Sequence, residues 1–290
     1  MASANVYLGC PLWAHPPWVG RFFTADARRE DYLPQYASVF GSAEGNATFY
    51  GLPTPETVKR WAGEAPPHFR FCFKFPREIS HERQLRDAGE ATARFFERLA
   101  PLADRMGPCF LQLHQAFGPE RLRDLAAYLA ALPKEHAYAV EVRHPAFFDG
   151  GDREAALDRV LREHGVDRVL FDTRGLFASA AQDEATLDAK RRKPRVPYRE
   201  TVTGRRPFVR FVGDPDLERN AEVFAQWARV VAGWMAAGLT PYFFLHHPDD
   251  LHAPALVRRF QQALFAANPA APAPAVWPCE RPIPGQLSLF

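Results

Sequence analysis

Eight short strand-like runs, each followed by a stretch with helical spacing of its apolar residues, dominate the pattern of this sequence. The strand-like runs cover residues 6–9, 42–49, 69–75, 109–114, 137–143, 169–172, 207–212 and 241–246. The helix-like stretches cover residues 32–40, 55–62, 88–103, 119–132, 153–164, 183–192, 217–236 and 253–267. This alternation predicts an α/β fold, a single TIM-type (β/α)8 barrel over residues 1–267.

An open, doubly wound sheet is the alternative fold for strands that alternate with helices. That fold usually carries a glycine-rich phosphate loop directly after its first strand. Here the first strand-like run leads into Gly9-Cys10-Pro11-Leu12-Trp13, which is not such a loop. No change in composition marks an internal linker before residue 268, so the sequence favours one barrel domain.

Composition sets limits on partners and location. The chain has 290 residues, 47% of them hydrophobic, and a formal net charge of +2, so a preference for nucleic acid would have to come from a local patch. No apolar run reaches membrane-spanning length, and the first residues lack an export signal, so we expect a cytoplasmic protein without a membrane partner. Four widely separated cysteines without a Cys-x-x-Cys pair fit a reducing compartment.

Polar residues within the strand-like runs predict a site at one end of the barrel. In a barrel strand one set of alternate side chains faces the helices, so a charged residue of the other set points to the axis or the rim. In the third run four phenylalanines take the helix-facing positions, which leaves Lys74 for the axis. The same rule gives Glu44 and Asn46, Gln112 and His114, Glu141 and Arg143, Asp172, Arg210 and His246 from the other runs. Barrel active sites lie at the carboxyl ends of the strands, where we expect these groups to meet.

The chemistry of this set is mixed. Its carboxylates can accept protons or bind a metal, whereas Lys74, Arg143 and Arg210 can neutralise a phosphate or carboxylate. One alternative is a buried ion-pair network that only fixes the barrel. Another is a divalent metal held by residues such as Glu44, Glu141 or Asp172, although no His-x-x-x-His or Glu-x-x-His spacing supports it. The additional amide and histidine side chains favour a ligand site.

Several ordered motifs resemble those of the YecE-like family, a bacterial domain of unknown function. They are Asn46-Ala47-Thr48-Phe49-Tyr50, Phe73-Lys74-Phe75-Pro76, Ile79-Ser80-His81, Glu141-Val142-Arg143-His144-Pro145 and Phe243-Phe244-Leu245-His246-His247-Pro248. The resemblance spans residues 6–265 and implies a barrel, but it supplies no reaction. The polar motif positions that it carries over are Asn46, Tyr50, Lys74, His81, Glu141, Arg143 and His144. Many relatives have Thr-Ser after the first-strand glycine and an Asn near the end of the last strand, where this chain has Cys10-Pro11 and His246.

The chain ends in a Pro- and Ala-rich segment, residues 268–290, which predicts a flexible tail. Its last five residues, Gln-Leu-Ser-Leu-Phe, resemble the peptide by which bacterial replication and repair proteins bind the DNA polymerase sliding clamp. The resemblance implies that Leu287, Leu289 and Phe290 fill a pocket of the clamp and that Gln286 forms a hydrogen bond at its rim. The alternative is that Leu289 and Phe290 pack on the body of the same chain.

A basic segment, residues 190–206, has two interpretations. It is either a solvated loop or a surface that follows nucleic-acid phosphates. With the tail, it leads to the expectation of a hydrolase or lyase that acts on a phosphorylated or nucleic-acid-derived substrate at DNA. In that hypothesis Glu141 is a general base or metal ligand, Lys74 and Arg143 bind the anion, and His144 or His81 transfers a proton. The alternative is a non-catalytic adaptor that binds a small anionic ligand.

Overall fold

Eight strands and nine α-helices alternate through residues 6–281, the range that the computed structural model describes. The strands are β1 Tyr7–Gly9, β2 Ser42–Gly45, β3 Arg70–Phe73, β4 Cys109–Gln112, β5 Tyr138–Glu141, β6 Asp167–Asp172, β7 Phe208–Val212 and β8 Tyr242–His246. The helices are α1 Tyr32–Ala37, α2 Pro55–Glu64, α3 Gly89–Leu99, α4 Leu122–Ala131, α5 Asp152–Glu163, α6 Arg174–Ala178, α7 Glu184–Arg192, α8 Ala221–Ala236 and α9 Ala253–Ala267. Each predicted run therefore contains a strand, and each predicted helical stretch contains a helix.

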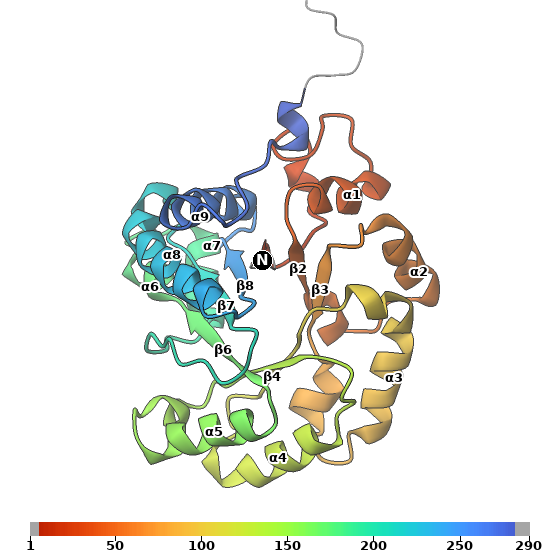
Figure 1. Ribbon diagram of the computed structural model, residues 1–290, viewed down its shortest axis with the longest axis vertical. Helices are drawn as coiled ribbons and strands as arrows, with labels where there is room; N and C mark the ends of the chain where they lie inside the picture. The colour runs from red at the N-terminus through yellow and green to blue at the C-terminus, as the bar shows by residue number, and fades with distance from the viewer. Residues whose placement is uncertain (1–5, 282–290) are drawn as a thin grey trace, which may run out of the picture.

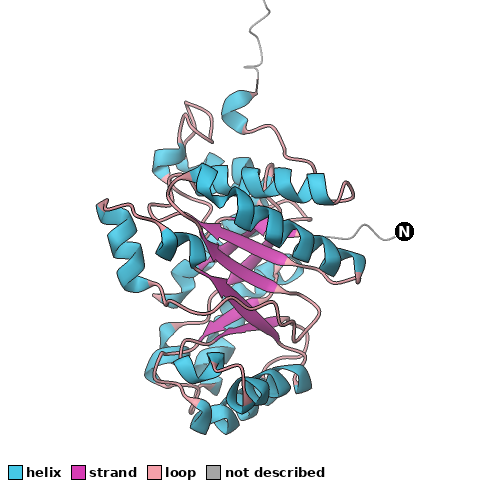
Figure 2. Cartoon of the chain, turned by 90° about the vertical axis from the view of Figure 1, so that its left-hand side faces the viewer, coloured by secondary structure: helices cyan, strands magenta, loops and turns pink. Residues whose placement is uncertain are grey.

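The strands form two parallel sheets. Six strands pair in the order β1-β8-β7-β6-β5-β4, and β2 pairs with β3. Figure 1 shows the helices around the outside of the strands, and Figure 2 shows the strands crossing one another as a curled layer between them. Both faces of the strands are covered, and every strand residue except Tyr7 and Arg70 is buried. The fold is thus α/β with a curled six-stranded parallel sheet, and the described residues do not form one continuous eight-stranded ladder.

A tyrosine hydroxyl bridges β1 and β2, where the ladder is interrupted. Tyr36, on the fully buried face of α1, accepts a hydrogen bond from the Cys10 amide at 2.7 Å and donates one to the Ser42 carbonyl at 3.0 Å. The Glu44 amide adds one backbone bond to the Cys10 carbonyl at 3.2 Å. Gly9 permits this close approach, since a Cβ there would lie 1.8 Å from the Ser42 carbonyl oxygen. A side chain thus satisfies backbone groups that a ladder would otherwise pair.

Two sets of side chains form the core. The larger set lies between the strands and the helices, and a smaller set fills the space enclosed by the strands. The smaller set contains Cys72, Phe110, Ala139, Val169, Phe208, Tyr242 and Phe244. Cys72 thus takes an inward position on β3, two residues before Lys74 and on the same side of the strand. Apolar packing of this interior leaves the carboxyl ends of the strands as the place for polar groups.

The first part of the predicted tail packs on the body of the protein. The ring of Trp277 meets Phe22 edge to face at 5.3 Å, and Arg258 binds both carboxylate oxygens of Glu280 at 2.7 Å. Trp277 and Glu280 thus have partners on the body of the protein, while the flexible tail over residues 268–290 stays a prediction. Gln286, Leu287, Leu289 and Phe290 lie outside the described residues.

Candidate functional site

A buried arginine joins two strands' glutamates at the carboxyl end of the sheet. Arg210 of β7 contacts Glu44 of β2 through Nε at 2.7 Å and Nη2 at 2.9 Å. Its Nη1 donates to Glu141 of β5 at 2.5 Å. The side chains of Glu44 and Glu141 are 0% and 1% exposed, so both charges are compensated inside the protein rather than by water.

Glu44 has no capacity left for another donor. Its Oε1 receives hydrogen bonds from Arg210 and from His246 Nε2, the latter at 3.1 Å, and its Oε2 receives them from Arg210 and from Asn46 Nδ2, the latter at 2.8 Å. Four donors match the four lone-pair sites of a carboxylate. A carboxylate only accepts, so the Nε2 atom of His246 carries the proton. Glu44 therefore holds the site together, and it is not free to bind a substrate.

The cationic groups around Glu44 and Glu141 keep both carboxyl groups ionised. Burial opposes ionisation, but Arg210 and His246 outweigh it and hold the pKa of Glu44 well below its usual value. At Glu141 burial is outweighed by Arg143 and Arg210, which lower its pKa to about 2. A carboxylate with so low a pKa is a poor general base at neutral pH. The expectation that Glu141 abstracts a proton therefore finds no support in this geometry.

Lys74 and Arg143 form the side of the network that faces a cavity. Gln112 Oε1 accepts hydrogen bonds from Lys74 Nζ and from Arg143 Nη2, both at 2.9 Å, while Arg143 Nε contacts Glu141 at 2.8 Å. Burial, with the neighbouring Arg210 guanidinium, lowers the pKa of Lys74 from its usual value to about 7. The uncharged amine is therefore more accessible to Lys74 than to a solvent-exposed lysine.

This cavity has a volume of about 700 Å³ and is open at the carboxyl ends of the strands. Six Lys and Arg side chains line it, against two acidic ones, Glu82 and Asp250. The cations are Lys74, Arg77, Arg143, Arg192, Lys193 and Arg210. Arg210 is neutralised by Glu44 and Glu141, which lie beneath the cavity surface. The other Lys and Arg side chains outnumber Glu82 and Asp250, so the cavity wall carries a net positive charge. The walls are suited to an anion.

Two of the family-motif residues, Tyr50 and His81, also line this cavity. Tyr50 is 84% exposed, at the rim. His81 lies in a π-helical turn after β3, and its ring is 4.9 Å from that of Phe49. Burial and the nearby Lys74 lower the pKa of His81 to about 4, so its imidazole is neutral at physiological pH. Gln84, Leu85 and Asp87, just beyond that turn, have positive φ, which marks a strained loop beside the cavity.

The placement predicted for Asp172 is corrected. Its carboxylate contacts Arg174 Nη2 and the Trp227 indole nitrogen, both at 2.8 Å, and so faces α6 and α8 rather than the cavity. Val169 and Phe171 take the inward positions of β6 instead. The rule that a charged strand residue points inward fails here because helix side chains supply its partners.

The placement of His144 is also corrected. Its Nδ1 accepts a hydrogen bond from the Ala146 amide at 3.2 Å, which caps the short 3-10 helix Pro145–Phe148. It is not among the residues that line the cavity. This contact assigns His144 a part in shaping the loop after β5, not in transferring protons within the site.

Sequence reasoning missed Lys193 as a wall residue. The basic segment 190–206 was interpreted as a loop or a nucleic-acid surface, yet Arg192 and Lys193 line the cavity. Burial and the Arg210 guanidinium lower the pKa of Lys193 to about 8. In a (β/α)8 barrel the chain that follows a helix normally lies at the amino ends of the strands, so no sequence signal places Arg192 and Lys193 at this cavity.

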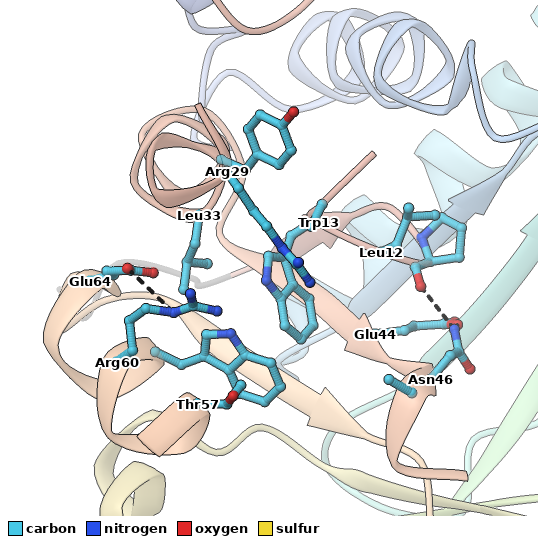
Figure 3. A pocket seen from close by; sticks show the side chains of 14 residues that line it. Leu12, Trp13, Arg29, Leu33, Glu44, Asn46, Thr57, Arg60 and Glu64 are labelled. Carbon is cyan, nitrogen blue, oxygen red and sulfur yellow. Dashed lines mark hydrogen bonds and ion pairs between the residues drawn. The ribbon is translucent and has the colours of Figure 1, made fainter. Parts of the chain in front are cut away.

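A smaller pocket adjoins the cavity. Its volume is about 300 Å³, and it shares Pro11, Leu12 and Asn46 with the larger cavity. Figure 3 shows Trp13 near its centre, Arg60 with Glu64 on the side of α2, and Glu44 with Asn46 on the other side. The rings of Trp13 and Trp61 meet edge to face at 5.1 Å. This pocket therefore offers aromatic surface next to the cationic wall.

Metal-binding groups do not converge within residues 6–281, because no cluster of three or more His, Cys, Asp or Glu side chains is arranged to hold an ion there. The carboxylates proposed as ligands, Glu44 and Glu141, are occupied by guanidinium groups. A metal would have to displace Arg210 from both. Over the same described range, no helix combines the length and apolar character needed to span a bilayer.

Comparisons with known proteins place the chain in a family. The family model "Protein of unknown function DUF72" matches residues 7–278. The chain is 43% identical over 288 residues to the UPF0759 protein YecE of Escherichia coli strain K12, which covers 98% of this chain and 100% of that protein. The YecE protein of Escherichia coli O157:H7 is 42% identical over the same length.

Two solved structures share the fold. A DUF72 family protein from Enterococcus faecalis V583 superposes with a TM-score of 0.67 at 19% identity, covering 89% of this chain and 95% of that one. A DUF72 family protein from Thermotoga maritima MSB8 gives 0.66 at 20% identity, covering 90% and 99%. At this identity the likeness concerns the fold alone. With the family model matching nearly all of the described residues, the chain belongs to the DUF72 family.

Proposed function

We propose that this protein is an enzyme, a hydrolase or lyase, that binds a phosphorylated or nucleic-acid-derived substrate in the cationic cavity. The observation that carries the proposal is the excess of Lys and Arg side chains on the wall of a cavity of about 700 Å³. Phosphate is the biological anion that such paired Lys and Arg donors bind most often. We also propose that the two sheets act together as one TIM-type (β/α)8 barrel, with this cavity at its catalytic end.

Arg143 is the strongest candidate for direct contact with the anion. Its guanidinium is held by Glu141 and Gln112 at 2.8 and 2.9 Å, which leaves further N–H groups for a ligand. A guanidinium whose orientation is already fixed loses little side-chain entropy on binding. Lys74 and Lys193 add charge at the same cavity.

The adjoining pocket favours a substrate with a planar part. A substrate with its phosphate in the cavity and its ring near Trp13 and Trp61 would pass Pro11 and Asn46, which line both spaces. Stacking on aromatic side chains is worth about 1–3 kcal/mol per nucleobase. A nucleoside monophosphate is therefore expected to bind more tightly than inorganic phosphate.

Thermal unfolding with inorganic phosphate and with adenosine monophosphate tests the proposal. A ligand at one hundred times its dissociation constant adds about 2.7 kcal/mol, which corresponds to about 5–11 °C for a chain of this size. Arg143→Gln should abolish most of the shift. Arg70→Gln is the matched control, because Arg70 lies at the opposite end of β3 and binds the Pro67 and Phe69 carbonyls.

Equal shifts in the Arg143 and Arg70 variants, or none in the wild type, would contradict anion binding at this cavity. Binding without turnover of any phosphate ester would leave the adaptor as the function instead of the enzyme. Assays of nicked, abasic and intact DNA, with and without divalent metals, cover the nucleic-acid substrates.

The tether to DNA is part of the proposal. It rests on the likeness of the final residues Gln286 to Phe290 to clamp-binding peptides. The last described residue, Arg281, lies beside α1, where its Nη2 donates to Ser38 Oγ at 2.9 Å. Five residues reach at most about 18 Å, so a clamp bound through residue 286 would lie close to α1.

A further inference from the structure

The Lys74 amine differs from the arginines that line the cavity, each of which pairs with a carboxylate. Its side chain is 9% exposed, yet it lines the open cavity. Nζ donates to Gln112 Oε1 at 2.9 Å and lies 3.8 Å from the centre of the Phe49 ring. Within the described part of the chain it has no ion pair with a carboxylate, whereas Arg143 and Arg210 are both paired. Lys74 is therefore an amine held by neutral neighbours at a wall that a ligand can reach.

Its surroundings favour the uncharged, nucleophilic form. Burial and the positive charges of Arg210 and Arg143 lower the pKa of Lys74 to about 7, and the buried Glu141 opposes them. A lysine that is desolvated beside other cations is the environment in which amines attack carbonyl groups. The hydrogen bond to Gln112 uses an N–H and leaves the nitrogen lone pair available.

His81 supplies a proton acceptor at the same cavity. Ser80 Oγ lies 3.2 Å from the Pro76 carbonyl oxygen and 2.9 Å from His81 Nδ1. We assign the imidazole proton to Nδ1, so that Ser80 Oγ accepts from it while donating to Pro76, and Nε2 is then the unprotonated nitrogen. The ring is neutral at physiological pH, as its lowered pKa requires. This tautomer has a lone pair at Nε2, and the high acidity of a C–H bond beside a protonated imine allows even a base of lowered pKa to take that proton.

We propose that Lys74 forms an imine with the carbonyl carbon of a phosphate-bearing aldehyde or ketone bound in the cavity. The proposal rests on the proposed function and names its substrate class. The amine nitrogen bonds to the carbonyl carbon, and the carbonyl oxygen takes up a proton. That proton comes from the amine nitrogen, which gives a carbinolamine. A second proton, taken from solvent at the open cavity, lets the oxygen leave as water as the C–O bond breaks, which leaves a protonated imine.

Of the two proposed reaction classes, hydrolase and lyase, a protonated imine at Lys74 favours the lyase. It accepts the electron pair of a C–H bond on the neighbouring carbon while His81 Nε2 takes the proton, and an enamine forms. The enamine expels a leaving group from the next carbon and becomes an imine again. Water then adds to that imine, releases the carbonyl product and returns the amine of Lys74. Arg143 holds the phosphate of the substrate during these steps.

Reductive trapping tests the imine. The full-length protein is incubated with pyridoxal 5′-phosphate or with glyceraldehyde 3-phosphate and sodium cyanoborohydride, and the adduct is located by intact mass and peptide mapping. We expect one predominant adduct per chain, on Lys74, and competition by inorganic phosphate. Lys74→Arg keeps the charge and should lower trapping at least tenfold, while its thermal shift with phosphate persists. Lys134→Arg, the matched change at a lysine outside the cavity whose Nζ donates to the Leu129 and Ala130 carbonyls, should still be trapped at Lys74.

Each other outcome has a defined meaning. A phosphate-dependent thermal shift without an adduct overturns the imine and leaves the proposed function standing. Neither a shift nor an adduct contradicts both. An adduct on Lys193, or one that phosphate does not displace, overturns the assignment to Lys74. Equal thermal stability of unliganded wild type and Lys74→Arg shows that the variant is folded.

Discussion

Removing Arg210 should turn Glu44 and Glu141 from groups that stabilise the folded protein into groups that destabilise it. In Arg210→Met the carboxylates of Glu44 and Glu141, 0% and 1% exposed, lose the guanidinium that contacts both. Breaking a buried pair by deleting one partner costs about 3–5 kcal/mol. For a chain of this size that lowers the melting temperature by about 6–20 °C. A loss of this size is a large part of a typical stability of about 5–15 kcal/mol.

The dependence on pH gives the sharper test. In the wild type both glutamates have lowered pKa values, so their contribution is complete above the unfolded value near 4.5 and is lost as the pH falls through the folded values, about 2 for Glu141. Without Arg210, burial dominates at Glu44 and raises its pKa, so the folded variant binds more protons than its unfolded chain. The difference in stability between variant and wild type should therefore shrink as the pH falls from 7 to 5.

Urea unfolding followed by circular dichroism at pH 7 and pH 5 measures both effects. Comparing variant with wild type at each pH cancels other groups that titrate in this window, such as the buried Asp167, whose pKa is raised by burial to about 7. Adding Glu44→Gln to Arg210→Met should recover about 1–2 kcal/mol, because it removes the unpaired charge. A loss below about 1 kcal/mol, or parallel changes with pH, would refute the account of a network that neutralises these carboxylates.

Three further predictions concern the fold and the tail. Tyr36→Phe should lower the unfolding free energy by about 1–3 kcal/mol, since the Cys10 amide and the Ser42 carbonyl lose their shared partner; unchanged urea midpoints would show that the bridge is dispensable. Trp277→Ala should cost about 1–2 kcal/mol by removing its contacts with Phe22 and Arg258, and wild-type stability would mean that residues 268–281 are not docked in solution. A chain ending at Gly285 should fail to capture the sliding clamp in a pull-down while keeping its melting temperature, and equal capture by both chains would remove the tether.

Most of the architecture could be predicted because apolar runs and helical spacing act locally. The eight strand positions follow from such runs, and the inward position of Lys74 follows from the four phenylalanines around it. The interruption of the ladder between β1 and β2 could not be predicted in this way. It depends on where the hydroxyl of Tyr36 arrives from another element.

The errors at the site have the same origin. Asp172 of β6 is charged but faces helices, because Arg174 of α6 and Trp227 of α8 bind it. A single strand's sequence does not contain those partners. In contrast, the convergence of Glu44, Gln112, Glu141 and Arg210 followed from each strand's own alternation. Which of them are free to react depended on hydrogen bonds that only the folded chain shows.

A crystal of the protein grown without phosphate or sulfate and soaked in tungstate gives the most direct test of the cationic cavity. Tungstate has the charge and shape of phosphate, and its anomalous signal locates it without reference to any assay. The account predicts a tungstate within hydrogen-bonding distance of Arg143 and Lys74. Tungstate bound only at outer-surface arginines, with the cavity occupied by water, would contradict it.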